Sequence, residues 1–384
     1  MRTAADVVVV GGGVVGVSAA YHLAAAGAGS VLLLERADQL GTGSTGACAG
    51  GFRHQFSSEV NILLSLVSVP MITGFEEEHG IPLDISPDGY LFMIRSEESW
   101  SEFLASVELQ RSLGVEVDLL TPEDAAELIP GISLDGMVGA TFGPRDGIAD
   151  PSGLTLGYAT AARRAGTEIL MGVEVLSIQV SDDRVAGVST SDGSVSAPLV
   201  VNAAGPWAGT LAASAGVDLP IDPIPRQVVV TGPFPGVPRR RTLVIDADTT
   251  FYFHREGEGV LMGMGGQDEK PSFDTAVDDS FIADELLPTA LGVFPPLEQA
   301  DLRYRWAGLY EMTPDRRPII GQAPGVGGLY LANGFSGHGF QHAPIVGKLL
   351  AEMIVEGRAH TVDVSSLGLE RFSRGPVVPE HHVV

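Results

Sequence analysis

One loop near the end of the chain concentrates residues that can hold a ligand. NGFSGHGFQH, at residues 333–342, contains three glycines, a serine and two histidines. An apolar strand is expected before it, at residues 329–332, and an amphipathic helix is expected to begin near Phe340. Such a loop leaves backbone N–H groups bare at the positive end of a helix, where an anionic or electron-accepting group can be held. The loop therefore predicts a ligand site, but it does not identify the ligand.

The start of the chain carries a second glycine-rich motif. Four consecutive valines at residues 7–10 predict a buried strand, G-x-G-x-x-G spacing follows at residues 11–16, and a helix with an apolar inner face comes next. The glycines permit a tight turn, leave room for a pyrophosphate against the backbone, and let the helix pack closely on the strand. A second strand ends at Glu35, where a carboxylate can accept hydrogen bonds from ribose hydroxyls. Together these features predict dinucleotide binding.

Small and hydroxyl-bearing residues at positions 41–46, GTGSTG, extend this site. They can approach both a pyrophosphate and a flavin ring closely. A nicotinamide enzyme does not usually need a second glycine-rich loop at this point. The pattern therefore favours FAD over a nicotinamide dinucleotide.

The composition of the 384-residue chain restricts the class of protein. With 45% apolar residues a large buried core is expected, and a formal net charge of −25 argues against binding to nucleic acid. A single cysteine, Cys48, excludes an internal disulfide, and the His338 and His342 pair has no third ligand, so no metal is expected. No segment reaches about 18 uninterrupted apolar residues. We therefore expect a cytoplasmic protein without a membrane span.

Three stretches give the chain a specific resemblance. They are the N-terminal motif through GSTGACAGGFRHQF, LVVNAAGPWAG at residues 199–209, and GLYEMTPDRRPIIG with GLYLANGFSGHGF within residues 308–340. In this order they resemble the FAD-dependent amine and amino-acid oxidoreductases, the group of D-amino acid oxidase, glycine oxidase and sarcosine oxidase. DGYLF, DGIADP and WAGLYEMTPD are most similar to the beta subunits of dye-linked L-proline dehydrogenase and heterotetrameric sarcosine oxidase.

The resemblance implies an α/β fold, in which a Rossmann-like FAD-binding domain carries an inserted α+β substrate domain built on an antiparallel sheet. The FAD-binding domain would be discontinuous and combine residues 1–80, 143–215 and 310–372. The substrate domain would combine residues 81–142 and 216–309. Within residues 168–203, short apolar strands alternate with Asp-Asp and Asp-Gly turns, which independently predicts an inserted meander. Residues 373–384 lack periodicity and are expected to form a loosely attached tail.

The motifs and the resemblance together assign a set of residues to non-covalent FAD binding. The first part of the set is Gly11, Gly13, Val15, Gly16, Glu35, Arg36, Gly43, Ser44, Thr45 and Gly50. The second part is Val175, Ala204, Gly205, Trp207, Gly308, Gly334, Ser336, Gly337, His338, Gly339, Phe340 and Gln341. In the family the C-terminal loop lies beneath the isoalloxazine, and the helix after it would direct its positive end at the N1–C2=O edge.

Amine oxidation by a flavin requires an unprotonated amine, a C–H bond directed at flavin N5 and no competing water, but no protein nucleophile. Arg53 is the first choice to bind a substrate carboxylate, because related enzymes place basic residues in this segment; pairing with an acid of its own fold is the alternative. His338 would approach the ring and influence proton movement or substrate placement, or it would merely fill the loop. Tyr252 and His254, two residues apart on a predicted strand, would line the substrate cavity or belong to the core.

Departures from the family pattern limit the mechanism. Monomeric sarcosine oxidase binds FAD covalently through a cysteine near the position of Gly308, so a covalent link is not expected here. The same relatives have a lysine at the position of Gln341, and a neutral glutamine cannot form an ion pair with a carboxylate. Leu261 lies near the position of a lysine associated with oxygen activation. Its identity favours a dehydrogenase over an oxidase.

The combined features predict FAD-dependent oxidation of the C–N bond of a small amino acid or secondary amine, such as proline, sarcosine or glycine. Hydride transfer to flavin N5 would give an imine. Trp306 and Tyr310 would wall the substrate pocket or pack in the core. The alternative is an FAD-carrying beta-type subunit or scaffold that is inactive without its partner. Besides the substrate, the expected partners are therefore an alpha-type subunit or a second copy of the chain.

Overall fold

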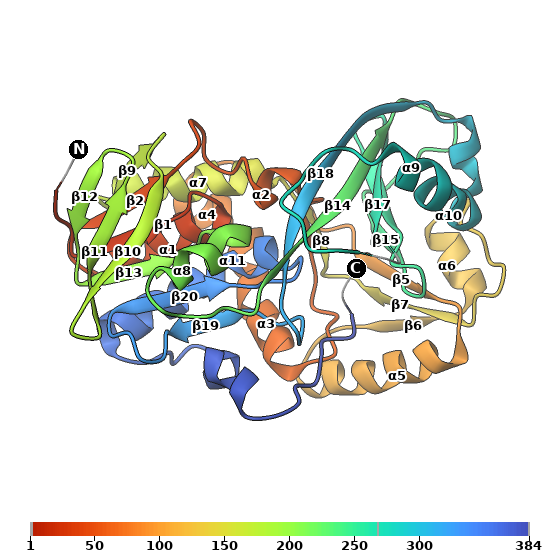
Figure 1. The fold of residues 1–384 in the computed structure, drawn as a ribbon. Coiled ribbons are helices and arrows are strands. Elements are labelled where there is room, and N and C mark those ends of the chain that lie inside the picture. The colour runs from red at the N-terminus through yellow and green to blue at the C-terminus, as the bar shows by residue number, and fades with distance from the viewer. Residues whose placement is uncertain (1–2, 267–268, 383–384) are drawn as a thin grey trace.

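Two large β-sheets lie side by side in the protein, and each carries helices of its own (Figure 1). The structure is a computed structural model that describes residues 3–266 and 269–382. Within these residues, no helix is both long enough and apolar enough to cross a membrane. The first sheet combines strands from near both ends of the chain and from its middle, and the strands of the second sheet lie between them in the sequence, so the chain passes between the sheets several times.

The first sheet contains the strand of the N-terminal glycine motif. Its six strands have the order β19-β20-β13-β1-β2-β9. They are β1 (Val7–Val10), β2 (Val31–Glu35), β9 (Glu168–Met171), β13 (Leu199–Asn202), β19 (Ile319–Gln322) and β20 (Leu329–Asn333). All neighbours are parallel except β19 and β20. The six strands fall within the ranges predicted for the FAD-binding domain, although the boundaries of that domain stay a prediction.

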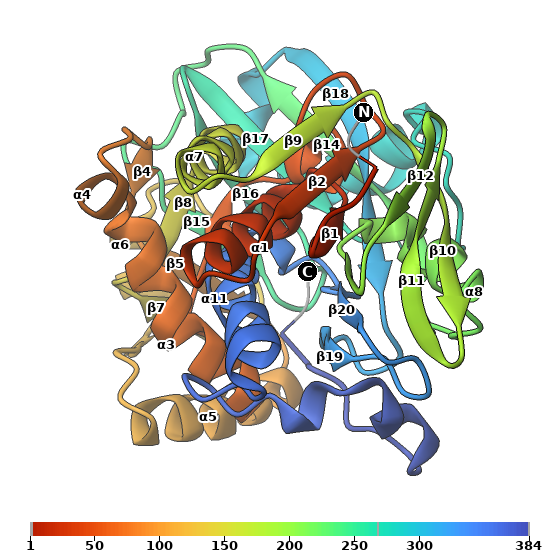
Figure 2. The same ribbon diagram turned by 90° about the vertical axis from the view of Figure 1, so that its left-hand side faces the viewer.

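Helices cover one face of this sheet, and a β-meander covers the other (Figure 2). The helices are α1 (Val14–Ala25), α3 (Glu59–Thr73), α7 (Pro151–Arg164) and α11 (Gly339–Ala351). The other face packs against β10 (Val175–Ser181), β11 (Arg184–Thr190), β12 (Gly193–Ser196) and α8 (Ala208–Ala213). Val7 and Val9 face the helices, and Val8 faces the meander. Because both faces are covered, β1 is a continuous apolar run.

The second sheet has eight strands in the order β18-β14-β17-β16-β15-β5-β7-β6. They are β5 (Tyr90–Ile94), β6 (Asp118–Leu120), β7 (Gly139–Gly143), β14 (Asp222–Thr231), β15 (Leu243–Asp246), β16 (Tyr252–Glu256), β17 (Gly259–Met264) and β18 (Leu302–Met312). β16 and β17 form a hairpin whose turn lies between Glu256 and Gly259. The prediction of an antiparallel sheet is wrong for one pair, since β5 and β15 run parallel. These two strands come from separate segments of the chain, so no hairpin imposes an antiparallel direction on them.

The two faces of the second sheet have different neighbours. One face packs against α6 (Pro122–Leu128) and α10 (Leu287–Val293) around a core that contains Phe253 and Phe294. The other face carries Tyr90, Val228 and Tyr252 and turns toward the first sheet. This second face forms one wall of the cavity described below.

The last residues contradict the prediction of a loosely attached tail. After α11 the chain forms single turns at Glu352–Glu356, Ser365–Leu367 and Leu369–Ser373. An extended segment then returns to the middle of the molecule, where the C-terminus is marked (Figure 1). Glu380 is fully buried, and His382 is only 4% exposed. The segment shows no apolar periodicity because polar contacts hold it.

Candidate active site

A cavity of about 480 Å³ lies between the two sheets and includes the first residues of two helices. Val14 and Val15, at the start of α1, line it, and so do Gly339 and Phe340, at the start of α11. Cofactor sites typically enclose about 300–1,000 Å³. Two positive helix ends at one cavity suit an anionic or electron-accepting ligand.

Glu35 and its neighbours form the part of the cavity at the end of β2. The Glu35 carboxylate accepts hydrogen bonds from the N–H of Gly12 at 2.6 Å and from the N–H of Ala37 at 2.8 Å, which fixes its orientation. The guanidinium carbon of Arg36 lies 3.6 Å from the ring centroid of Trp207. A fixed carboxylate beside a flat wall of guanidinium and indole fits the ribose and base of a dinucleotide.

The glycines of the N-terminal motif differ in their structural roles. Gly11 and Gly13 line the cavity, whereas Gly16 does not. A Cβ atom on Gly16 would stand 1.9 Å from the carbonyl oxygen of Gly11, so this glycine lets α1 pack on the turn. Gly11 has a φ of 109°, and a Cβ there would meet the carbonyl oxygen of Ala203 at 2.3 Å. Only glycine can adopt this backbone in this space.

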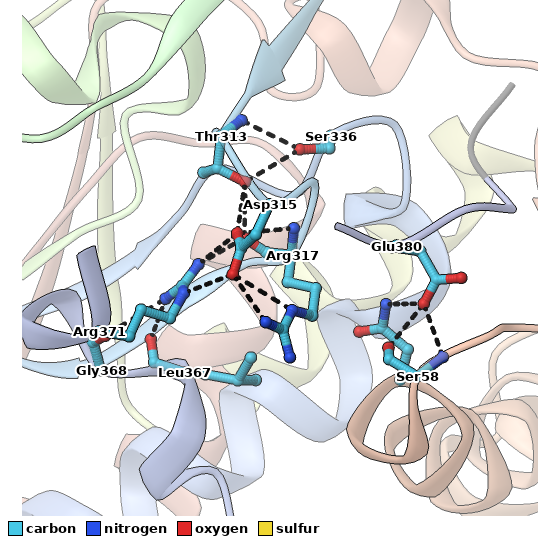
Figure 3. A network of polar contacts seen from close by, with 10 residues as sticks. Ser58, Thr313, Asp315, Arg317, Ser336, Leu367, Gly368, Arg371 and Glu380 are labelled. Atoms are coloured by element: carbon cyan, nitrogen blue, oxygen red, sulfur yellow. Dashed lines mark hydrogen bonds and ion pairs between the residues drawn. The ribbon is translucent and has the colours of Figure 1, made fainter. Parts of the chain in front are cut away.

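The loop between β20 and α11 is shaped by contacts with the end of β18. A Cβ on Gly337 would stand 2.4 Å from the Tyr310 ring, and one on Gly334 would stand 2.3 Å from the side chain of Thr313. The hydroxyl of Ser336 accepts a hydrogen bond from the N–H of Thr313 at 3.2 Å (Figure 3). Gly334 and Ser336 therefore shape the loop and do not line the cavity.

Most residues of the predicted site line this one cavity. The predicted cofactor-binding residues all do so except Gly16, Gly334 and Ser336, and Arg53, Tyr252 and His338 line it as well. His254 does not. Its Nδ1 lies 2.8 Å from the carbonyl oxygen of Arg255, and burial lowers its pKa to about 4. The prediction that His254 lines the substrate cavity is therefore wrong, and this residue is a neutral histidine of the core.

Arg53 is held by other parts of its own chain. The residue is 2% exposed and lies directly after β3 (Gly51–Phe52). Its Nη1 donates to the carbonyl of Gln55, its Nη2 donates to the carbonyl of His382, and Nη2 also lies 3.1 Å from Nε2 of His338. Both terminal nitrogens thus have partners, so the contacts do not support the predicted binding of a carboxylate by Arg53. Its acceptors are all neutral, so they do not support the alternative of a bonded acid either.

His338 and Gln341 connect the start of α11 to the Arg53 segment. Burial, together with the charge of Arg53, lowers the pKa of His338 well below its usual value. His338 is therefore neutral at pH 7, and its Nε2 can accept a hydrogen bond from Arg53. The side-chain oxygen of Gln341 accepts the backbone N–H of Arg53 at 3.0 Å. The first turn of α11 is consequently tied to Arg53 at two points.

Arg226, on β14, has an unused donor, and the sequence analysis missed it. Its side chain lines the cavity and is 11% exposed. Nη1 forms an ion pair with Glu269, whereas the buried Nε has no hydrogen-bond partner among the described residues. Burial lowers the pKa of Arg226, and the nearby Tyr310 and Tyr252 oppose this effect. The guanidinium carbon lies 4.9 Å from the centroid of the Tyr310 ring.

A signal for Arg226 was present in its strand. The segment PIPRQVVV reads as a period-two strand, and Arg226 shares a face with Val228. A charged residue at an inward position of an apolar strand is a candidate for function. The sequence does not say which face of the strand meets a cavity. Arg226 could therefore not be distinguished from an arginine on a solvent-facing side of the strand.

Glu311, on β18, is a second cavity residue that the sequence analysis missed. Protein atoms cover the residue only partly, but its carboxyl oxygen Oε2 is enclosed and has no hydrogen-bond partner among the described residues. Burial raises the pKa of Glu311 to about 7, although hydrogen bonds from the backbone of Gly334 and Phe335 lower it. This carboxyl group can therefore change its charge near neutral pH.

Known proteins resemble the chain over nearly its whole length. The family model described as FAD dependent oxidoreductase matches residues 6–353. Mitochondrial sarcosine dehydrogenase of Mus musculus is 31% identical over 388 residues, which cover 97% of this chain but only 42% of that protein. FAD-dependent oxidoreductase domain-containing protein 1 of Bos taurus is 33% identical and covers 99% of this chain and 87% of that protein. The crystal structure of L-proline dehydrogenase from P. horikoshii is 33% identical and matches with a TM-score of 0.91 over 98% of this chain and 100% of that chain.

Proposed function

This chain belongs to the FAD-dependent oxidoreductase family, and from that premise we propose that it oxidises the C–N bond of a small amino acid or secondary amine. The names of two relatives support proline-like or sarcosine-like substrates. One observation carries the proposal: a single cavity includes the starts of both glycine-flanked helices and a half-buried arginine whose Nε has no hydrogen-bond partner among the described residues. The first feature suits FAD, and the second suits a carboxylate.

The residues of the cavity fit FAD. Glu35 would accept hydrogen bonds from the ribose, the start of α1 would face the pyrophosphate, and the start of α11 would face the ring edge that gains negative charge on reduction. When bound, FAD accepts a hydride from the carbon atom next to the amine nitrogen. Gly308 has no group that could bond to the flavin, and burial raises the pKa of the Cys48 thiol to about 11, so this cysteine stays protonated. Both residues favour non-covalent binding.

Arg226 would hold the carboxylate of the substrate. Charge-assisted hydrogen bonds between a guanidinium and a carboxylate are short, strong and directional. The ion pair with the partly exposed Glu269 supports this role, and a substrate carboxylate would compete with Glu269 for the guanidinium. Because the carboxylate and the amine of an amino acid share one carbon, holding the first restricts the position of the second.

Tyr252 and Tyr310 would complete the substrate site beside Arg226. Burial raises the pKa of both phenols, so both hydroxyl groups remain protonated and can donate hydrogen bonds at neutral pH. Their rings are apolar and line the cavity. The wall that they form would exclude water from the C–H bond that is broken.

Anaerobic reduction of the purified flavoprotein tests the proposed function. The oxidised protein would be mixed with L-proline, sarcosine, glycine or N,N-dimethylglycine, and the visible absorption of the flavin would be followed. At least one of these compounds is expected to bleach the flavin. Pyrrolidine, which is proline without its carboxylate, is expected to reduce the flavin more slowly because Arg226 cannot hold it.

Two results would contradict the proposal in different ways. If dithionite bleaches the flavin and no amine in the panel does so, the isolated chain does not oxidise these amines. The same panel would then be repeated with proteins that copurify from the source cell, which tests the beta-type subunit that needs a partner. If the purified protein binds no flavin, the assignment of the cavity to FAD is wrong.

A further inference from the structure

The C-terminal segment is anchored in the protein by a buried acid. The Glu380 carboxylate accepts hydrogen bonds from the N–H and hydroxyl groups of Ser58 (Figure 3). It also accepts hydrogen bonds from the N–H and hydroxyl groups of Ser57 and from the side-chain amide of Asn61. Ser58 is the N-cap residue of α3, so the carboxylate occupies the positive end of that helix. Burial alone would raise the pKa of Glu380, but His382 and the two serines lower it to about 2. The anchor is therefore ionised at neutral pH.

His382 connects this anchor to the active site. Its ring stacks on Phe103 of α5 (Glu97–Ser112), with the ring centroids 4.1 Å apart and an angle of 12° between the planes. Its backbone carbonyl accepts the hydrogen bond from Nη2 of Arg53. The same nitrogen lies 3.1 Å from His338 at the start of α11. One hydrogen bond thus separates the segment from a residue of the cavity wall.

Among the described residues, no acid is hydrogen-bonded to the buried guanidinium of Arg53, although the negative charges of Glu380 and Asp146 act on it from a distance. Its three acceptors are the carbonyls of Gln55 and His382 and the imidazole of His338, all of them neutral. Glu380 is close in sequence to His382, but its carboxylate is bonded to the start of α3 instead. Burial lowers the pKa of Arg53, but a guanidinium remains charged at neutral pH. A fixed positive charge in a cavity wall stabilises negative charge that develops inside the cavity.

We propose that the C-terminal segment Pro379–His382 is a positioning element of the active site. Glu380 docks the segment on α3, and the carbonyl of His382 fixes the guanidinium of Arg53 in the cavity wall. The segment thereby determines how strongly the cavity stabilises negative charge. This inference rests on the proposed function, because the negative charge in question is that of the reduced FAD ring.

The segment borders a second cavity of the protein. This cavity of about 470 Å³ separates Pro379–His382 from part of α5 and from the turn at Pro314 and Arg316. Within the described residues, the segment is held by the polar contacts of Glu380 and His382 and by the stacking of the His382 ring on Phe103. Its loss would expose Arg53 to water, which screens the charge and lets the side chain move.

Three proteins test the proposal: a chain that ends at Gly375, the full chain with Glu380→Gln, and the full chain with Val378→Ala. Val378 is 71% exposed and serves as the control. The measurement is the midpoint potential of the bound flavin, obtained by titration with dithionite against a redox dye. Truncation is expected to shift the reduction equilibrium at least about tenfold toward oxidised flavin, which is about 30 mV lower for a two-electron couple. Glu380→Gln is expected to give a smaller shift in the same direction, because loss of the Glu380 negative charge near Arg53 partly opposes it, and Val378→Ala is expected to give none.

Addition of the missing segment as a peptide distinguishes loss of the positioning contacts from a folding defect of the truncated chain. A peptide of residues 376–384 is expected to restore the potential of the truncated protein, and the same peptide with glutamine at position 380 is expected to restore it only at a higher concentration. A truncated flavoprotein with the potential of the Val378→Ala protein would overturn the proposal, even if its thermal stability were lower. If truncation prevents flavin binding, Glu380→Gln decides, since a potential equal to that of the control would overturn the proposal as well.

These measurements need no substrate, so they remain informative if the proposed function fails. A shifted potential in a protein that no amine reduces would support the positioning role and contradict amine oxidation. An unshifted potential in a protein that proline does reduce would contradict the positioning role and support amine oxidation.

Discussion

The two arginines of the cavity have opposite surroundings. Arg53, on the side of the first sheet, is 2% exposed, and neutral groups from three separate segments hold both of its terminal nitrogens. Arg226, on the second sheet, pairs with the partly exposed Glu269 and keeps a buried nitrogen without a hydrogen-bond partner among the described residues. An arginine with occupied donors is fixed and acts through its charge. An arginine with an unused donor and an exchangeable acid can bind a ligand.

Of the substitutions that test this difference between the two arginines, Arg226→Met is expected to have the largest effect on activity. Methionine keeps much of the apolar volume but removes the charged donors. The kcat/KM for a carboxylated amine is expected to fall about a hundredfold, or about 3 kcal/mol, because a charge-assisted hydrogen-bonding partner is lost. Stopped-flow reduction of the flavin by proline and by pyrrolidine measures this effect. Pyrrolidine should be little affected, and equal losses for the two amines would show that Arg226 is not the carboxylate site.

Arg53→Met should produce the opposite pattern. The free energy of unfolding is expected to fall by about 2–4 kcal/mol, because three buried acceptors lose their donor. The rate of flavin reduction should change by the same factor for proline and for pyrrolidine. Urea denaturation gives the stability, with Arg145→Met as a control, because the side chain of Arg145 is 76% exposed in a surface ion pair with Glu116. A lower rate of flavin reduction with proline but not with pyrrolidine would indicate that Arg53 binds the substrate carboxylate.

Glu311, on β18 of the second sheet, gives this side of the cavity a pH dependence near neutral pH. Its pKa is about 7 in the folded protein, against an ordinary value of 4.5. Because folding raises this pKa, the contribution to stability is fully present below about pH 4.5 and is lost as the pH rises through about 7. Apoprotein with Glu311→Gln should therefore lose less stability between pH 5 and pH 8, and should be about 2 kcal/mol more stable than the unmodified apoprotein at pH 8.

Urea denaturation of the apoprotein at several pH values checks this prediction. The exposed Glu258 supplies the matched control, and Glu258→Gln should leave the pH dependence unchanged. Parallel curves for Glu311→Gln and the unmodified apoprotein would mean that the Glu311 carboxyl is ionised throughout this range.

The dinucleotide part of the site could be predicted from the sequence because it depends on local backbone geometry. Gly16 is required by its contact with Gly11 within one turn, and Glu35 ends the neighbouring parallel strand. Spacing along the chain is sufficient to recognise such an arrangement. The strands and the first helix of this region were predicted for the same reason.

The arrangement of the substrate side depends on contacts that no local pattern contains. Tyr252 and His254 share a face of β16, but the cavity reaches only the first of them. The docking of the tail depends on Glu380 and Ser58, which are 322 residues apart, and polar contacts of this kind leave no periodicity. Arg53 was recognised by resemblance, yet its contacts with Gln55 and His382 change the role that its residue type suggests.

Tyr252→Phe is expected to have the smallest effect. It tests whether the Tyr252 hydroxyl acts on the substrate together with Arg226 or independently of it. Loss of one neutral donor should lower kcat/KM for proline about fivefold, or about 1 kcal/mol. In the Arg226→Met background the loss should be smaller, because no carboxylate is held where the hydroxyl can reach it. In the Arg53→Met background the two effects should add, because Arg53 and the hydroxyl share no partner. The same loss in all three backgrounds would mean that Tyr252 only shapes the cavity, and the carboxylate would then have to be held away from β16.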